Sequence, residues 1–255
     1  MDTAADIALA IHIAAGFVGV VAFFIPVATA KGQRTHRAAG WIFSLAMLTA
    51  ATTGAALSAN TLLQGPQNAR PFAWFLLYIA ALTAFGALHG LRMLRFQDRK
   101  GPHPSTLDFI LPTALLLGGP ALIVYGILIP NTLLATFPII GVVLGGVTLC
   151  YLMRDDPHRV HWKTEHMTGM FTAGISSITA FLVTGAASAA REIPTLGPAA
   201  ANALESPLAW FLPSAVLVPI LSIMIAREKR RAAKPLGVTA EPKPATARTL
   251  EHAKR

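Results

Sequence analysis

The amino-acid sequence predicts an all-α fold: a polytopic transmembrane bundle of seven spans, with its N-terminus outside and its C-terminus in the cytoplasm. Three observations support this fold class. The 255-residue chain is 54% hydrophobic and only 13% charged, with a mean hydropathy of +0.55, whereas soluble domains carry roughly a quarter charged residues. It contains seven long apolar stretches. Its Lys and Arg residues concentrate in every second connection between those stretches.

A helix that crosses a bilayer needs about 20 mostly apolar residues. The predicted spans are residues 7–30, 38–62, 72–93, 109–129, 133–153, 167–190 and 208–226. Only Pro130, Asn131 and Thr132 separate the fourth span from the fifth, which predicts a tight hairpin, with one re-entrant element as the alternative. Prolines 112, 120, 138, 213 and 219 predict kinks in the fourth, fifth and seventh spans.

The distribution of charge predicts the orientation. Of the 21 Lys and Arg residues, 19 lie in the first, third and fifth connections or after the seventh span, and only Arg70 and Arg191 lie on the other side. Loops rich in Lys and Arg remain in the cytoplasm. The N-terminus is then outside, as an odd number of spans requires. The cations lie beside spans, where anionic lipids attract them, so we expect lipid partners and no nucleic acid.

The chain divides into a membrane domain, residues 1–232, and a basic tail, residues 233–255. The tail is rich in Lys, Pro, Ala and Thr. It has too few apolar residues to fold alone, so we expect it to be disordered in the cytoplasm. The chain begins with an acidic segment, Met1 to Asp6, without the basic residues of a secretory signal, so we expect the first span to be retained.

Small residues recur at every fourth position in several spans. The second span has Ala46, Ala50, Gly54 and Ser58, and the third and fifth have the pairs Gly86/Gly90 and Gly141/Gly145. The sixth has a stripe of mostly hydroxyl residues: Thr168, Thr172, Ser176, Ala180, Thr184 and Ser188. This spacing favours close helix packing. For the sixth span, a polar path through the membrane is the alternative.

No Asp, Glu, Lys or Arg falls in the middle of a predicted span. Transporters and pumps usually keep such residues there to bind a coupling ion, so a carboxylate-driven transporter and an intramembrane protease are disfavoured. The only cysteine, Cys150, excludes an intramolecular disulfide and a cysteine-based metal cluster, and is best explained as a small core residue.

Histidine is the residue type that remains for chemistry. Seven of the eight lie in or beside the spans: His12, His36, His89, His103, His158, His161 and His166. Imidazole is the commonest protein metal ligand and an axial ligand of haem. The predicted cofactor-binding residues are His89, His36 and His166 near the cytoplasmic face, Arg37 as a partner for a carboxylate such as a haem propionate, and His12 at a separate outer site.

The glycines near His89 and His12 suit either a flat cofactor or a neighbouring helix, and a structural role remains the alternative for each histidine. The predicted metal ligands are His158, His161 and His166, although their spacing matches no zinc signature. Met167 and Met170 offer thioethers near His166 or simple packing. His103 is expected in a polar loop, outside any site.

The segment Thr35-His36-Arg37-Ala38-Ala39-Gly40-Trp41 resembles the His-Arg-x-x-Gly turn of a bacterial membrane-protein family described as a domain of unknown function. In that family an intramembrane histidine precedes this turn, as His12 does here. The opening of the sixth span at His166-Met167 partly resembles a later family motif, while the family's Trp-Met-x-Arg form is absent. A weaker similarity is to helical b-type cytochromes. The resemblance implies a multi-pass protein of the bacterial inner membrane, and it implies no particular reaction.

We therefore expect a membrane protein that binds haem b or a transition metal through histidines near the cytoplasmic face, with a redox or electron-transfer role. The alternatives are a small-molecule permease and a non-catalytic scaffold or complex subunit, in contact with a membrane protein partner or a second copy. A metal-dependent lipid hydrolase is a third class. It needs a buried acid near one face, and none is expected here.

Overall fold

The protein is described by a computed structural model that covers residues 3–155, 160–193 and 197–233. The structure of these residues is helical, without strands. The helices are α1 (Thr3–Ala28), α2 (Arg34–Gln64), α3 (Arg70–Met93), α4 (Leu107–Leu128), α5 (Thr132–Thr136), α6 (Ile139–Leu152), α7 (His161–Ala180), α8 (Ala187–Arg191), α9 (Gly197–Glu205) and α10 (Pro207–Ala233). The predicted tail falls almost entirely outside the described residues.

Among the described residues, seven helical segments are long enough and apolar enough to cross a membrane, in agreement with the predicted number of spans. Two of them are composite. The fifth joins α5 to α6, and the sixth continues from α7 through a π-helical segment, Phe181–Ala186, into α8. The seventh is α10, which runs on past the predicted end of its span at residue 226 through a charged segment to Ala233. Because a helix does not need to stop where its apolar stretch stops, the observed helices extend beyond several predicted limits.

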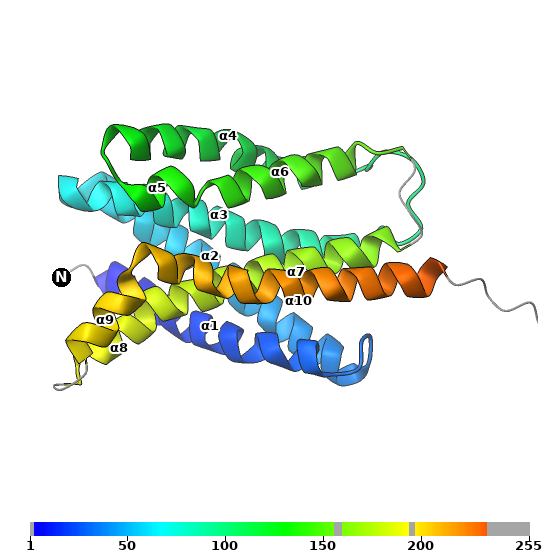
Figure 1. Cartoon of the computed structure of the whole chain (residues 1–255), viewed down its shortest axis with the longest axis horizontal. Coiled ribbons are helices and arrows are strands. Elements are labelled where there is room, and N and C mark those ends of the chain that lie inside the picture. Colours follow the sequence, from blue (N-terminus) through cyan, green and yellow to red (C-terminus); the bar gives the residue numbers. More distant parts are fainter. Residues whose placement is uncertain (1–2, 156–159, 194–196, 234–255) are drawn as a thin grey trace, which may run out of the picture.

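The long helices run along the length of the bundle (Figure 1). Helix α3 is central, because it packs against α2, α4 and α7. Helices α4 and α6 pair on one side of it, and α1 pairs with α2 on the other. Helix α10 packs mainly on α7. Helix α9 packs on α8 at the end of the bundle where α1 begins (Figure 1), in a segment that was predicted to be a connection.

Proline explains the one clear break. Helix α5 ends at Thr136, and α6 begins directly after Pro138. Proline lacks a backbone N–H and its ring collides with the preceding turn, so a break here agrees with the predicted kink. The hairpin between α4 and α5 is also as predicted, and the Asn131 side chain accepts a hydrogen bond from the Leu134 N–H at 3.1 Å, which caps α5.

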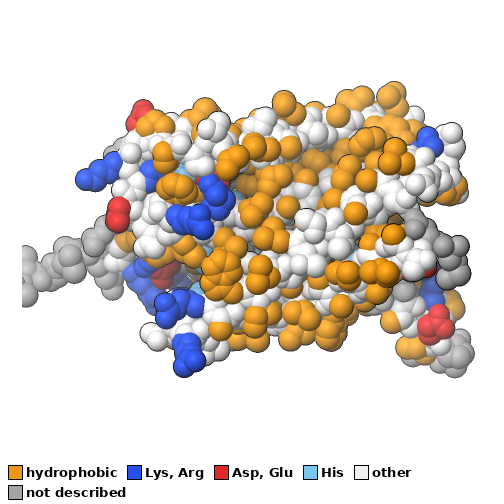
Figure 2. All heavy atoms as spheres, turned by 180° about the vertical axis from the view of Figure 1, so that it is seen from behind, with side chains coloured by type: hydrophobic (Ala, Val, Ile, Leu, Met, Phe, Trp, Pro, Cys, Tyr) orange, Lys and Arg blue, Asp and Glu red, His pale blue; other side chains and the backbone are white. Residues whose placement is uncertain are grey.

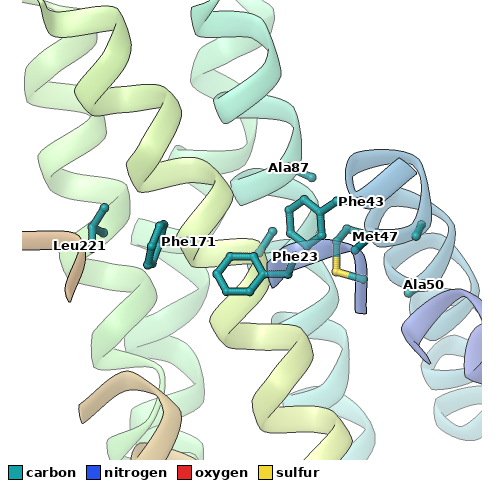
Figure 3. Packing of buried hydrophobic residues seen from close by; sticks show 10 residues of the cluster. Phe23, Phe43, Met47, Ala50, Ala87, Phe171 and Leu221 are labelled. Atoms are coloured by element: carbon teal, nitrogen blue, oxygen red, sulfur yellow. The ribbon is translucent and has the colours of Figure 1, made fainter. Parts of the chain in front are cut away.

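Two apolar clusters fill the bundle. The first joins α1, α2, α3, α7 and α10, with Phe23, Phe43 and Phe171 at its centre (Figure 3). The second surrounds Phe75 and Trp210 at the other side of α3. Many large apolar side chains face outward, as expected for helices that contact lipid (Figure 2).

The small residues serve helix packing. A Cβ atom at Gly169 of α7 would lie 2.5 Å from the Gly90 nitrogen and 2.6 Å from the Gly86 oxygen, so α3 and α7 cross with their backbones in contact. The hydroxyls of Thr168, Thr172 and Ser176 donate to carbonyls one turn earlier in α7 itself. The first three hydroxyls of the stripe therefore have their hydrogen-bond acceptors within their own helix, which favours helix packing over a polar path through the membrane. Gly40 is different, because no atom lies within 4 Å of a Cβ built there, so it does not bring α2 close to a neighbouring helix.

Candidate functional site

Histidines from several elements meet at the end of the bundle where the basic side chains gather (Figure 2). His36 opens α2, His89 lies one turn from the end of α3, His103 lies in the α3–α4 connection, and His161 and His166 lie in the first turns of α7. They form separate groups rather than one cluster.

The first group is the pair His36 and His166. Their ring centroids are 6.5 Å apart, with planes inclined at 61°. His36 Nδ1 lies 3.2 Å from the Pro26 carbonyl oxygen, and His166 Nδ1 lies 2.8 Å from the Gly90 carbonyl oxygen. A carbonyl can only accept, so Nδ1 is the protonated nitrogen in both rings. Each Nε2 then has a lone pair when the ring is neutral, and neither has a hydrogen-bond partner among the described residues.

Lys31 lies close to this pair. Its Nζ donates to the carbonyl oxygens of Pro26 and Val27 at 2.6 and 2.8 Å, which caps the end of α1. Burial lowers the pKa of this amine below its usual value. Lys31 and His36 thus share the Pro26 oxygen, so the turn between α1 and α2 holds the His36 ring in place. Arg37, predicted to hold a propionate, is exposed.

The second group is built on His89. Its Nε2 lies 3.0 Å from Glu165 Oε2, with the histidine side chain 3% and the glutamate side chain 19% exposed. Phe85 stacks on the His89 ring at 5.3 Å, and Tyr151 approaches it edge-on at 6.3 Å. The His89 imidazole is thus bound by a carboxylate, and within the described residues its ring does not contact the rings of His36 and His166. The prediction that these three imidazoles come to the same end of the bundle is met, but only two of them are neighbours.

Tyr151 links this group to α7 and to the α3–α4 loop. Its hydroxyl lies 2.7 Å from His161 Nδ1, and the Arg99 guanidinium lies 4.5 Å from the centre of its ring. His161 is buried and bonded to Tyr151, whereas His166, five residues later, is bonded to Gly90. These two predicted metal ligands therefore have different partners.

The third predicted metal ligand, His158, lies outside the described residues. Among the residues that the structure does describe, no group of three or more His, Cys, Asp or Glu side chains is placed to hold a metal ion. Met170 packs on Gly90, and its sulfur accepts a hydrogen bond from the Ser44 hydroxyl at 3.8 Å, which fits the packing interpretation of this methionine.

A buried ion-pair network corrects the prediction for His103. Its side chain is 0% exposed and its Nε2 lies 2.5 Å from Asp108 Oδ2. Asp108, 4% exposed, is also bound by the Arg92 guanidinium, which donates to Ser105 Oγ at 2.8 Å as well. His103 therefore lies in the polar loop, as predicted, but its side chain is buried in an ion-pair network. The expectation that no buried acid lies at this face was wrong.

His12 has a structural role on the opposite half of the bundle. Its Nδ1 donates to the Ala50 carbonyl oxygen at 2.9 Å, and Thr53 Oγ1 lies 3.2 Å from the same nitrogen. The glycines predicted to give a cofactor room are used otherwise. Gly86 and Gly90 contact α7, and Gly19 contacts Met47. The space beside His89 is thus filled by α7, whereas no atom lies within 4 Å of a Cβ built at Gly16, the other glycine near His12.

Three functional side chains were not predicted from the sequence: the acids Glu165 and Asp108 and the ring of Tyr151. Both acids were placed just outside predicted spans, which began at residues 167 and 109, whereas α7 begins at His161 and α4 at Leu107. If the sixth predicted span had been extended by one or two turns toward its N-terminus, Glu165 would have been placed on α7. Its pairing with His89, 76 residues away, depends on tertiary structure.

The fold and this end of the bundle define a class: an all-helical protein with seven candidate membrane spans and paired polar residues at their basic ends. Comparisons with family models, with curated proteins and with solved structures found no match to this chain.

Proposed function

We propose that this is a multi-pass protein of the bacterial inner membrane that binds a transition-metal ion through His36 and His166, in a redox or electron-transfer role. The observation that carries the proposal is the pair of rings 6.5 Å apart, each fixed by an Nδ1–H bond to a backbone carbonyl. Metal-ligating histidines almost always donate their other ring nitrogen in this way, which orients the ring and raises its basicity.

The distance between the rings supports the same proposal. A bond from zinc to an imidazole nitrogen is about 2.0–2.1 Å long, so two rings on one ion have centroids about 5–6.5 Å apart. The observed separation lies at the upper end of that range. Imidazole suits copper, iron, nickel and zinc, and of these copper and iron supply one-electron chemistry. Further ligands would be water, a partner or a substrate.

A metal ion is favoured over haem b. A porphyrin needs a flat space between helices, and the glycines that offered such space on α3 contact the backbone of α7 instead. Haem remains the second candidate because the pair has the two imidazoles that a six-coordinate haem iron takes. Arg37 would then be the residue that holds a propionate.

The proposal includes the orientation of the protein in the membrane. The basic ends of the spans would lie in the cytoplasm, with the N-terminus outside, because Lys and Arg concentrate at one end of the bundle (Figure 2). The pair His36 and His166 would then face the cytoplasm.

The test is elemental analysis and a visible spectrum of the purified protein, before and after dithionite. We expect stoichiometric metal in the wild type and its loss in His36→Ala and in His166→Ala. His89→Gln is the matched control, because residue 89 lies at the same end of the bundle. We expect the glutamine amide to keep a hydrogen bond to Glu165. Retention of metal in both alanine variants, or its loss in His89→Gln alone, contradicts the assignment. Wild-type protein with neither metal nor a Soret band would end the redox proposal and favour the permease or scaffold alternative.

A further inference from the structure

The connection between α3 and α4 forms an open surface cavity of about 520 Å³ that the proposed metal site does not use. It is lined by residues of the segment 94–104, including Arg95, Asp98, Arg99 and Lys100. The segment begins one residue after α3 ends at Met93. If α3 spans the membrane, the cavity lies at the level of the lipid headgroups, just beyond the end of that helix.

The loop that forms the cavity is held on the end of α6. Arg99 donates from its two terminal nitrogens to the carbonyl oxygens of Tyr151 and Leu152, at 3.1 and 3.2 Å. The backbone N–H of His103 donates to the same Leu152 oxygen at 2.8 Å. Gly101, with φ of +80°, supplies the turn between these anchors, a conformation that other residues rarely adopt. The shape of the cavity is thus fixed by bonds to a rigid element.

The cavity has an excess of positive charge. Three cations and one carboxylate, Asp98, line it, which leaves a net charge of +2. None of the four takes part in an ion pair within the described residues, and Nε of Arg99 is buried without a hydrogen-bond partner there. The carbonyls at the end of α6 offset part of the Arg99 charge, since a helix C-terminus carries about −0.5 of an elementary charge. Arg95 and Lys100, both exposed, remain free to bind an anion.

We propose that the 94–104 loop binds a phosphate group, either that of an anionic phospholipid or that of a soluble phosphate compound. Phosphate offers several anionic oxygens to Arg95 and Lys100 at once, and Arg99 adds the field of a cation that is held in place. Arg and Lys are the residues that bind phosphate most often, the first through a planar fork and the second as a point charge. This proposal is independent of the metal site, whose histidines lie on other elements.

The test uses purified protein in a neutral detergent, titrated with dioctanoyl phosphatidylglycerol, with dioctanoyl phosphatidylcholine or with inorganic phosphate. The thermal unfolding midpoint reports binding. The variant is Arg95→Gln/Lys100→Gln, which keeps the Arg99 anchor so that the loop stays folded. The matched control is Lys229→Gln/Arg230→Gln, which removes the same charge from the basic end of α10, at residues without an ion pair among those described.

We expect phosphatidylglycerol to stabilise the wild type and to bind the loop variant about ten- to thirty-fold more weakly, since each cation near a membrane surface contributes about 1 kcal/mol. The control variant is expected to stay within about two-fold of the wild type. Protection by phosphatidylglycerol but not by inorganic phosphate identifies a lipid headgroup, and protection by inorganic phosphate identifies a soluble ligand. Equal losses in both variants, no loss in the loop variant, or no protection of the wild type by any phosphate compound overturns the proposal.

Discussion

His12 and Gly54 face each other across the contact between α1 and α2: a Cβ atom at Gly54 would lie 3.0 Å from His12 Cε1. The same imidazole donates to the Ala50 carbonyl one turn earlier on α2. A histidine inside an apolar span thus satisfies its polar nitrogen with a backbone oxygen, and a glycine provides the space for its ring. This relationship explains why small residues recur on this face of α2.

We predict that Gly54→Leu destabilises the protein by about 1–3 kcal/mol, because the larger side chain collides with the His12 ring and separates the helices. Thermal or denaturant unfolding in detergent measures the effect. Gly40→Ala is the control on the same helix, where a Cβ meets no atom within 4 Å. Equal stability of Gly54→Leu and the wild type would show that this face of α2 is not in contact with α1.

The crossing of α3 and α7 gives a second prediction. In Gly169→Ala the added methyl group would overlap the backbone of Gly86 and Gly90, which cannot move aside as a side chain can. We expect a loss of about 1–3 kcal/mol or more from overpacking. Gly146→Ala is the comparison, because its Cβ would have ordinary contact with Leu116 Cδ1 at 3.8 Å. Unfolding curves of similar midpoint for the two variants would contradict the close crossing.

The network around Asp108 gives a third prediction. Asp108→Ala leaves His103 buried without its acceptor and removes the partner of Arg92, so we expect a loss of about 3 kcal/mol, in the range for breaking a buried pair. Asp98→Ala, at an exposed position of the adjoining loop, is expected to change stability by less than about 0.5 kcal/mol. A fully stable Asp108→Ala protein would mean that the network contributes nothing to folding.

The orientation is tested by fusions. A reporter that is active only in the periplasm is expected to be silent when it is fused after Arg231 and active when it is inserted near Asn68, which lies beside Arg70 at the opposite end of the bundle. The reason is that 19 of the 21 Lys and Arg residues fall in the first, third and fifth connections or after the seventh span. The reverse pattern of activity would assign the basic end to the periplasm.

The seven spans were predictable because each depends on a local property, a run of about 20 apolar residues. The break at Pro138 and the packing role of Gly54 were predictable for the same reason, since proline and small residues act within one or two turns. Helix α9 was not, because its nine residues are too short and too mixed in character to distinguish from a connection.

The sequence predicted which residue types form the candidate site and at which end of the spans they lie. It did not predict which histidines lie next to each other. Sequence spacing placed His36, His89 and His166 at one end of the bundle, and only the arrangement of α2, α3 and α7 decides which rings meet. His103 shows the limit most clearly. A polar residue between Pro102 and Pro104 has every local property of an exposed loop, and it is buried because Asp108 and the end of α6 bind it.

The glycine contact between α3 and α7 also constrains how the protein is made. Gly86 and Gly169 are 83 positions apart in the chain, and chains are synthesised at about 5–20 residues per second, so α7 follows α3 by about 4–17 s. During that interval the glycine face of α3 lacks the α7 backbone that covers it in the folded protein. The central crossing of the bundle therefore forms late, after the hairpin of α4, α5 and α6 has been inserted, and a ribosome that pauses before α7 leaves the core of this protein open to the bilayer.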